Sequence, residues 1–255
     1  MLTIDLNCDM GESYGVYNLG CDEEAMSYVT SINVACGFHA SDPSNMLKTI
    51  RMAKRHGIAI GAHPSFPDLI GFGRRFMAAS PEEIKADVIY QIGALAGLCQ
   101  AEGVTLQHVK VHGALYNAAE QDIQVATAIA EAIKAINPNL YMLCLGNSTM
   151  VTAAKNVGVK YVEEAFADRA YTSRGTLVPR KEAGSVIHDL AQVAERVLMM
   201  VKDKSVISID GKIVPIRVQT ICVHGDTAGA VEMIKAIRTM LEIQGIQCSA
   251  FGEER

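Results

Sequence analysis

Several kinds of sequence feature are missing from this chain of 255 residues, and their absence narrows its function. It has no run of about 18 apolar residues, so we expect no membrane-spanning segment. The formal net charge of −5 provides no basic surface, so we do not expect a nucleic-acid partner. No stretch reads as a linker, a repeat or a low-complexity segment, so we predict a single domain covering residues 1–255.

The seven cysteines show no paired spacing such as CxxC. An odd number without such spacing is typical of reduced thiols in a cytoplasmic protein. The N-terminus enters a predicted strand at once, which leaves no room for a signal peptide. Cys8, Cys36, Cys144 and Cys222 lie in or near predicted strands, and we expect them to pack in the core.

Strand-like and helix-like segments alternate along the whole chain. We predict strands at about residues 2–9, 31–36, 58–63, 107–112, 140–145, 159–164 and 218–224. Helices are expected at about residues 22–29, 43–56, 81–102, 121–136, 148–157, 184–203 and 227–243. Seven successive strand–helix units indicate a parallel sheet with right-handed crossovers.

Four of these strands carry polar residues on one face only. Successive side chains on a strand point to opposite faces, so each of the four has an apolar face and a partly charged one. The polar faces contain Asp5, Asn7 and Asp9, then Gly61 and His63, then His108, Lys110 and His112, and finally Thr220, Cys222 and His224. Because buried charges are costly unless they are paired or coordinate something, the pattern predicts an active site where the strands converge.

Polar residues also occur at the carboxyl end of nearly every predicted strand. An open doubly wound sheet gathers such residues at one switch point, whereas a closed ring brings all the strand ends together. We therefore predict an irregular seven-stranded (β/α) barrel, similar to a TIM barrel. Residues 205–217 read as a hairpin insertion around Asp210-Gly211, which decorates the barrel or closes its base.

The sharpest group of candidates is Asp9, His63 and His112, which should meet at the barrel mouth. One carboxylate with two imidazoles is a reasonable ligand set for a divalent metal, with positions left for water and substrate. The alternative is a hydrogen-bonded histidine pair that orients substrate without a metal. Lys110 lies one step below His112, and is either a base with a lowered pKa or part of a buried ion pair with Asp5 or Asp9.

Further candidates lie beside this group. Asp5 and Asn7 are expected to support the ligands, and Asn7 is also a candidate for substrate binding. Glu12 follows Asp9 across a glycine turn, so it either shares the metal, divides acid and base roles with Asp9, or is simply solvated. His39 follows the second predicted strand and is a candidate for substrate contact.

Two connections, residues 64–80 and 164–183, are longer than simple turns and carry arginines that suggest an anionic ligand. In residues 64–80 the segment 71–75 (GFGRR) offers backbone N–H groups beside guanidinium groups, which suits phosphate or carboxylate. No GxxxxGK[ST] motif occurs, so this is not a P-loop. The alternative for surface arginines is no specific role. The candidates for substrate or phosphate contact outside the first strands are Arg74, Asp168, Arg169 and His224.

Several long motifs resemble those of the LamB/YcsF family. They are residues 5–12 (DLNCDMGE), 33–43 (NVACGFHASDP), 61–68 (GAHPSFPD) and 109–117 (VKVHGALYN), extended by 164–171 (EAFADRAY) and 223–226 (VHGD). The resemblance covers essentially the whole chain. It implies a barrel similar to that of glycoside hydrolases and polysaccharide deacetylases. In metal-dependent relatives of that fold an aspartate and two histidines hold the metal, and Asp9, His63 and His112 occupy matching positions.

The resemblance also implies a function. The family provides one subunit of an ATP-dependent 5-oxoprolinase, which opens the lactam of 5-oxo-L-proline to L-glutamate while hydrolysing ATP to ADP and phosphate. That subunit works with two partners, subunits B and C, and the implied cofactor is ATP with Mg²⁺. In this interpretation ATP phosphorylates the amide oxygen and water attacks the activated carbon. Arg74 or Arg169 would bind phosphate or the substrate carboxylate, while Asp9 or His112 manages protons or metal-bound water.

Two other functions stay open at this point. One is a metal-dependent deacetylase or amidohydrolase acting on a small N-acyl or carbohydrate substrate without ATP. The other is a non-catalytic subunit that binds substrate and switches its partners. A polar barrel mouth argues against a pure scaffold, because burying many ionisable groups without a task is expensive.

Overall fold

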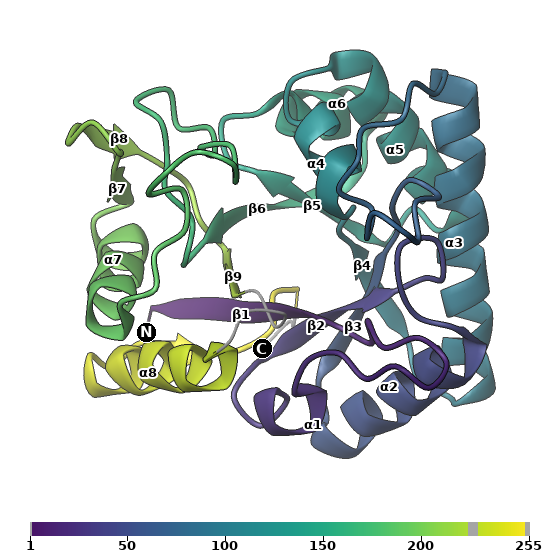
Figure 1. The fold of residues 1–255 in the computed structure, drawn as a ribbon, viewed down its shortest axis with the longest axis horizontal. Coiled ribbons are helices and arrows are strands. Elements are labelled where there is room, and N and C mark those ends of the chain that lie inside the picture. Colours follow the sequence, from purple (N-terminus) through teal and green to yellow (C-terminus); the bar gives the residue numbers. More distant parts are fainter. Residues whose placement is uncertain (1, 224–228, 253–255) are drawn as a thin grey trace.

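The computed structural model describes residues 2–223 and 229–252. Within them, seven parallel strands close into a barrel (Figure 1). These strands are β1 (Thr3–Met10), β2 (Ser31–Ala35), β3 (Ala59–His63), β4 (Leu106–Val109), β5 (Tyr141–Leu145), β6 (Lys160–Phe166) and β9 (Thr220–Val223). They follow one another in that order, and pairing of β1 with β9 completes the ring. The predicted seven-stranded barrel is confirmed.

Helices surround the barrel on its outer side (Figure 1). They are α1 (Asp22–Ala25), α2 (Pro43–His56), α3 (Pro81–Ala101), α4 (Gly113–Ala119), α5 (Ile123–Ile136), α6 (Thr149–Val157), α7 (Leu190–Lys202) and α8 (Ala230–Ile243). The apolar strand faces, including fully buried Leu6 and Cys8, belong to the hydrophobic core. Among the described residues, no helix is both long enough and apolar enough to cross a membrane.

Two helix boundaries follow directly from local sequence chemistry. The hydroxyl of Ser80 accepts from the backbone of Glu83, and the Glu83 carboxylate accepts from the backbone of Ser80, which forms a capping box at the start of α3. Pro81 occupies the first helical position, where its missing N–H costs nothing. Gly57 ends α2 at φ +65°, a conformation that glycine adopts without strain.

Other boundaries differ from the predicted ones. The predicted helix 184–203 begins only at Leu190, because Val186 forms a bridge with Arg169 and the Asp189 side chain caps the helix by accepting from the Gln192 N–H. The predicted strand 107–112 ends at Val109, and helix α4, which was not predicted, begins immediately after His112. Gly113 makes this sharp change of direction at φ +58°.

The base of the barrel is covered by the C-terminal segment. Strand β10 (Gln247–Cys248) pairs with the start of β1, and the Phe251 ring packs edge-on against His108 with centroids 5.3 Å apart. The hairpin of β7 (Ser205–Ile207) and β8 (Ile213–Pro215) lies elsewhere, beside the loops that follow β5 and β6. Of the two predicted roles for residues 205–217, the hairpin therefore decorates the side of the barrel.

Candidate active site at the barrel mouth

The polar strand faces point into the barrel and form layers, of which the lowest surrounds Asp5. Its carboxylate accepts hydrogen bonds from the hydroxyl groups of Thr30 (2.6 Å), Ser31 (2.8 Å) and Thr220. Burial raises the pKa of Asp5 to about 6, and the three hydroxyl groups oppose this rise. This layer is a hydrogen-bonded network whose residues do not line the cavity at the barrel mouth.

Asn7 occupies the next layer, where all of its side-chain hydrogen-bonding capacity is used. Its amide nitrogen donates to Glu164 (2.9 Å) and Thr220 (2.7 Å), while its amide oxygen accepts from Asn33 (2.8 Å) and Lys110 (3.3 Å). The residue is fully buried and does not line the cavity at the barrel mouth, which is described below. The prediction that Asn7 contacts substrate is therefore corrected, and its place is that of a support for Glu164 and Lys110.

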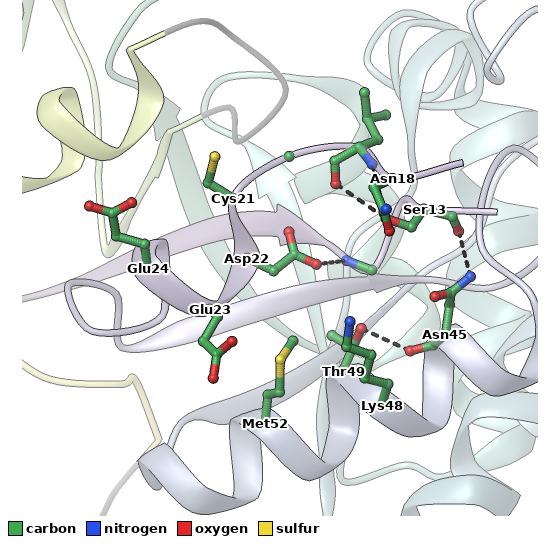
Figure 2. A pocket seen from close by; sticks show the side chains of 13 residues that line it. Ser13, Asn18, Cys21, Asp22, Glu23, Glu24, Asn45, Lys48, Thr49 and Met52 are labelled. Atoms are coloured by element: carbon green, nitrogen blue, oxygen red, sulfur yellow. Dashed lines mark hydrogen bonds between the residues drawn. The ribbon is translucent and has the colours of Figure 1, made fainter. Parts of the chain in front are cut away.

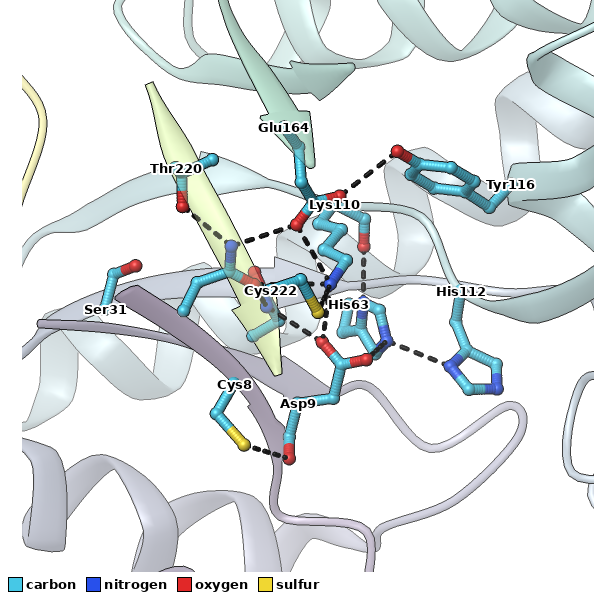
Figure 3. A network of polar contacts seen from close by, with 12 residues as sticks. Cys8, Asp9, Ser31, His63, Lys110, His112, Tyr116, Glu164, Thr220 and Cys222 are labelled. Atoms are coloured by element: carbon cyan, nitrogen blue, oxygen red, sulfur yellow. Dashed lines mark hydrogen bonds and ion pairs between the residues drawn. The ribbon is translucent and has the colours of Figure 1, made fainter. Parts of the chain in front are cut away.

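Lys110 links several strands at the centre of the barrel (Figure 3). Its ammonium group lies 3.0 Å from Asp9 Oδ1, 3.1 Å from Glu164 Oε1 and 2.9 Å from Cys222 Sγ. Burial by itself lowers the pKa of Lys110, but the carboxylates of Asp9 and Glu164 keep this pKa well above its usual range. Of the two predicted roles for Lys110, the geometry favours the buried ion pair over the deprotonated base.

His63 and His112 face one another above this ion pair. His63 Nδ1 lies 2.6 Å from the Lys110 carbonyl, and His112 Nε2 lies 2.9 Å from the Phe72 carbonyl. Carbonyl oxygens only accept, so both of these nitrogens carry the protons. The two remaining nitrogens, His63 Nε2 and His112 Nδ1, then point their lone pairs at one another across 2.9 Å (Figure 3). This arrangement calls for a positive species between or beside the rings.

Two further side chains complete the group at the mouth. The His39 ring stacks on His112, with centroids 3.9 Å apart, and neither of its buried nitrogens has a hydrogen-bond partner among the described residues. Glu12 Oε1 lies 3.6 Å from His39 Nε2 and 4.0 Å from His112 Nδ1. Burial lowers the pKa of both His39 and His112 well below the usual value, which keeps these rings neutral.

The geometry changes the predicted metal set. One ligand atom from each of Glu12, His39, His63 and His112 lies within 4.8 Å of all the others. Asp9 stands beside this compact group, with Oδ2 3.3 Å from His63 Nε2 and Oδ1 on Lys110. The structure thus keeps His63 and His112 together as expected, and adds Glu12 and His39.

The segment 71–75 does not form the predicted anion-binding nest. The backbone N–H groups of Gly71 (2.9 Å) and Arg75 (3.2 Å) donate to the Asp68 carboxylate, and the N–H of Gly73 donates to the Asp68 carbonyl. The Arg75 guanidinium also binds Asp68, which holds the pKa of that carboxyl at about 2. Because these donors are already used, the prediction is wrong, and the loop instead covers the histidines.

A cavity of about 520 Å³ opens beside the histidines. Among the predicted site residues its lining includes Asp9, Glu12, His63, Arg74, Lys110, His112 and Arg169. The Arg169 guanidinium donates to the carbonyls of Val178 (2.6 Å) and Ser185 (3.4 Å), so it also fixes the loop that follows β6. Asp168 is buried away from this lining, and His224 lies outside the described residues.

Glu164 and Tyr116 belong to the network but were not identified as site residues from the sequence. Glu164 accepts from Lys110, Asn7 and Tyr116, whose hydroxyl lies 3.1 Å from Glu164 Oε2. It stands next to Glu163, and two adjacent glutamates on a strand hide which of them faces inward. Tyr116 was missed because helix α4, which carries it, was not predicted.

Comparison with known proteins agrees with this fold and identifies the family. The model of the LamB/YcsF family matches residues 4–255. The chain belongs to the LamB/YcsF family. A relative from Clostridium beijerinckii, named as the A subunit of 5-oxoprolinase, is 53% identical over 247 residues, which cover 97% of each chain.

Solved structures extend the comparison. The crystal structure of a lactam utilization protein from Thermus thermophilus is similar with a TM-score of 0.94 and 48% identity. The match covers 98% of this chain and 100% of that one. A structure described as T48 deacetylase with substrate is similar with a TM-score of 0.50 and 14% identity, over 97% of this chain and 87% of that one. The second likeness shows a shared barrel fold.

Proposed function

We propose that this LamB/YcsF protein is the A subunit of an ATP-dependent 5-oxoprolinase, built as one barrel domain. It opens the lactam of 5-oxo-L-proline to L-glutamate, coupled to hydrolysis of ATP to ADP and phosphate. The observation that carries the proposal is 53% identity over 97% of the chain to a relative named as the A subunit of 5-oxoprolinase. The same name supports assembly of this chain with companion subunits B and C. The seven free cysteines support a cytoplasmic location.

We assign the chemical roles from the contacts at the mouth. A lactam is a stable amide, so transfer of a phosphoryl group from ATP to the amide oxygen, with Mg²⁺ on the nucleotide, activates the carbon for attack by water. The ring C–N bond then breaks as the nitrogen takes up a proton, and a second water releases phosphate from the acyl phosphate to leave glutamate. We assign to Asp9, which lies beside His63 and lines the cavity, the role of taking a proton from the water that attacks the activated carbon. Arg74 lines the same cavity and is assigned to the phosphate or the substrate carboxylate.

A divalent cation fits the residues at the mouth. The ligand atoms of Glu12, His39, His63 and His112 all lie within 4.8 Å of one another. Three of their six separations, 2.9, 3.6 and 4.0 Å, are near the edge of about 3.4 Å in a tetrahedral site with bonds of about 2.1 Å. Carbonyl acceptors behind His63 and His112 direct their lone pairs inward, as behind metal-binding histidines in general. When bound, such a cation lowers the pKa of water and polarises a carbonyl oxygen.

The stacked rings set one condition on this site. His39 and His112 are parallel to within 4°, and a single ion cannot lie in the plane of both rings. Coordination by both histidines therefore requires one ring to turn out of the stack. With His112 fixed to the Phe72 carbonyl, we assign that movement to His39, whose nitrogens have no hydrogen bond to lose among the described residues.

The test is product formation from 5-oxo-L-proline and ATP by this chain, with and without purified companion subunits B and C. Glutamate and phosphate in equal amounts, only in the complete mixture, would support the coupled reaction. Phosphate without glutamate would exclude 5-oxo-L-proline as the coupled substrate. If no mixture forms glutamate or phosphate, and the chain alone releases acetate from small N-acetyl compounds, the deacetylase alternative would be established instead.

A further inference from the structure

The loop between β1 and α1 displays apolar side chains in a fixed conformation. Tyr14 and Tyr17 exchange two backbone hydrogen bonds of 3.0 and 2.9 Å, which close a tight turn over Gly15 and Val16. The turn leaves Val16 87% and Tyr17 76% exposed, although both are apolar or aromatic. A loop that is both ordered and apolar is unusual for a surface that faces only water.

Hydrogen bonds at its base hold this loop against α2. Asn45 of α2 donates to the Ser13 carbonyl (3.2 Å), and the N–H of Gly15 donates to Asp42 (2.9 Å). The N–H of Gly11 donates to Asp22 (2.8 Å), so the far end of the loop is fixed as well. Figure 2 shows the contacts of Asn45 with Ser13 and of Asp22 with Gly11 around a hollow between the loop and α2. The loop is therefore pre-ordered, which reduces the entropy lost when it binds a partner.

The loop between β3 and α3 has the same character. Ile70 is 93% and Phe76 71% exposed, and Leu69 is also exposed. The contacts of Asp68 with the backbone of Gly71, Gly73 and Arg75 described above keep these side chains in place. Leu69 and Ile70 directly follow this fixed aspartate.

Both loops stand on the rim of the barrel mouth. They follow β1 and β3, which flank β2, so their bases are about 10 Å apart. Each loop also contributes to the site, through Glu12 in the first and the Phe72 carbonyl and Arg74 in the second. We call the exposed residues of the two loops the rim surface, consisting of Tyr14, Val16, Tyr17, Leu69, Ile70 and Phe76.

The size of the rim surface matches that of a protein interface. With about 170 Å² for a side chain of this size, the six exposed fractions amount to roughly 700 Å² of exposed surface, summed over the two loops. A stable complex buries about 800 Å² on each partner. The rim surface therefore has nearly the area of one side of a stable interface.

We propose that the rim surface binds a companion subunit of the proposed 5-oxoprolinase, which contacts it through a complementary apolar face and covers the cavity mouth. This inference rests on the proposed function, since it takes its occupant from the subunit name of the relatives. Docking there places the partner directly over Glu12 and Arg74, so that an activated substrate passes between the subunits without entering bulk water.

The test compares the double substitution Val16→Asp with Ile70→Asp against Ile243→Asp. Ile243 is 74% exposed at the end of α8, near the base of the barrel, and is the matched control. The companion subunits B and C are titrated against each variant, with binding followed by interferometry and glutamate followed in parallel. We expect the double variant to need at least about tenfold more companion for half-saturation, and the control to stay within about twofold of the unsubstituted chain.

Each outcome bears on a different claim. If the unsubstituted chain makes glutamate and the double variant does so at the same half-saturation, the rim surface is not the docking site although the proposed function stands. If the unsubstituted chain neither binds the companions nor makes glutamate with them, the proposed function fails together with this inference. If sedimentation shows a dimer of the chain that the double substitution dissociates, the occupant is a second copy.

Discussion

Asp5 at the base of the barrel and the histidines at its mouth are equally buried, yet they are satisfied in different ways. The Asp5 carboxylate is surrounded by three hydroxyl donors that rotate to suit it. At the mouth, His63 and His112 point lone pairs at one another, and His39 has no hydrogen-bond partner among the described residues. Buried polar groups are nearly always hydrogen-bonded, so the two unsatisfied nitrogens of His39 distinguish the mouth from the base.

This difference separates a structural network from a site that expects a ligand. A closed network gains nothing from an added ion, because its donors and acceptors already match. An open network with convergent lone pairs gains from a cation or a substrate group. Lys110 lies between the two layers and joins them through Asp9, Glu164 and Asn7.

The largest expected effect comes from removing the charge that joins the layers. Lys110→Met takes the ammonium group from between Asp9 and Glu164, both buried, and should lower the free energy of unfolding by about 3–5 kcal/mol. Urea unfolding near neutral pH measures this change. Cys222→Ala, which removes only the thiol contact of Lys110, serves as the control and should cost clearly less. A loss below about 1 kcal/mol for Lys110→Met would contradict the buried ion pair.

Cation binding should depend on the mouth alone. His112→Ala removes an inward lone pair and should weaken binding of zinc or cobalt by about a hundredfold, measured by competition with a chromophoric chelator. His108→Gln is the matched control, since both nitrogens of this buried histidine already contact Gln107 and Asn33. Equal losses in both variants would show that the cation site does not coincide with the open network.

Packing between the layers gives a smaller effect. A Cβ at Gly61 would lie 2.1 Å from His108 Nε2, so Gly61→Ala should destabilise the fold by about 1–3 kcal/mol. Gly97→Ala in α3 meets no atom within 4 Å and should be neutral or stabilising. The melting temperatures of Gly61→Ala and Gly97→Ala, measured by thermal unfolding, test this prediction. Equal melting temperatures would mean that His108 moves aside freely.

At the base of the barrel, the protonation of Asp5 should make the stability of the fold depend on pH. The folded pKa of Asp5, about 6, lies above its unfolded value, so its stabilising contribution is complete below about pH 4 and is lost as the pH rises through about 6. Asp5→Asn removes this dependence and should flatten the stability profile by about 1–2 kcal/mol between about pH 5 and pH 7.5. The free energy of unfolding of both proteins is measured in urea as a function of pH. If it changes with pH by the same amount in both, the pKa of Asp5 is not raised.

Strand parity predicted much of this arrangement. Alternation alone placed Asp9, Lys110 and His112 on inward faces, and the structure brings them together with His63. The alternation of side chains between the two faces follows from the backbone of a strand, so the predicted faces stay the same when the predicted strand ends are slightly wrong. The α3 capping box and the glycine end of α2 were equally local and equally readable.

Long-range contacts were not readable in the same way. The segment 71–75 looked like an anion nest because its N–H groups are many, and only the fold shows that Asp68 already uses several of them. Parity gives directions and not distances, so it could not show that Glu12 and His39, rather than Asp9, complete the compact group with the two facing histidines. The tautomers of His63 and His112 are set by the backbone carbonyls of Lys110 and Phe72, each of which lies far along the sequence from the histidine that it contacts. No local sequence pattern reveals such contacts.

The most direct test of the account compares one aspartate from each end of the barrel. Asp9→Asn and Asp5→Asn are each assayed for glutamate formation from 5-oxo-L-proline and ATP with saturating companion subunits. The account predicts a loss of about a hundredfold or more for Asp9→Asn, and a rate within a few fold of the unsubstituted chain for Asp5→Asn. Full activity of Asp9→Asn, or an equal loss in both variants, would contradict a reactive mouth above a structural base.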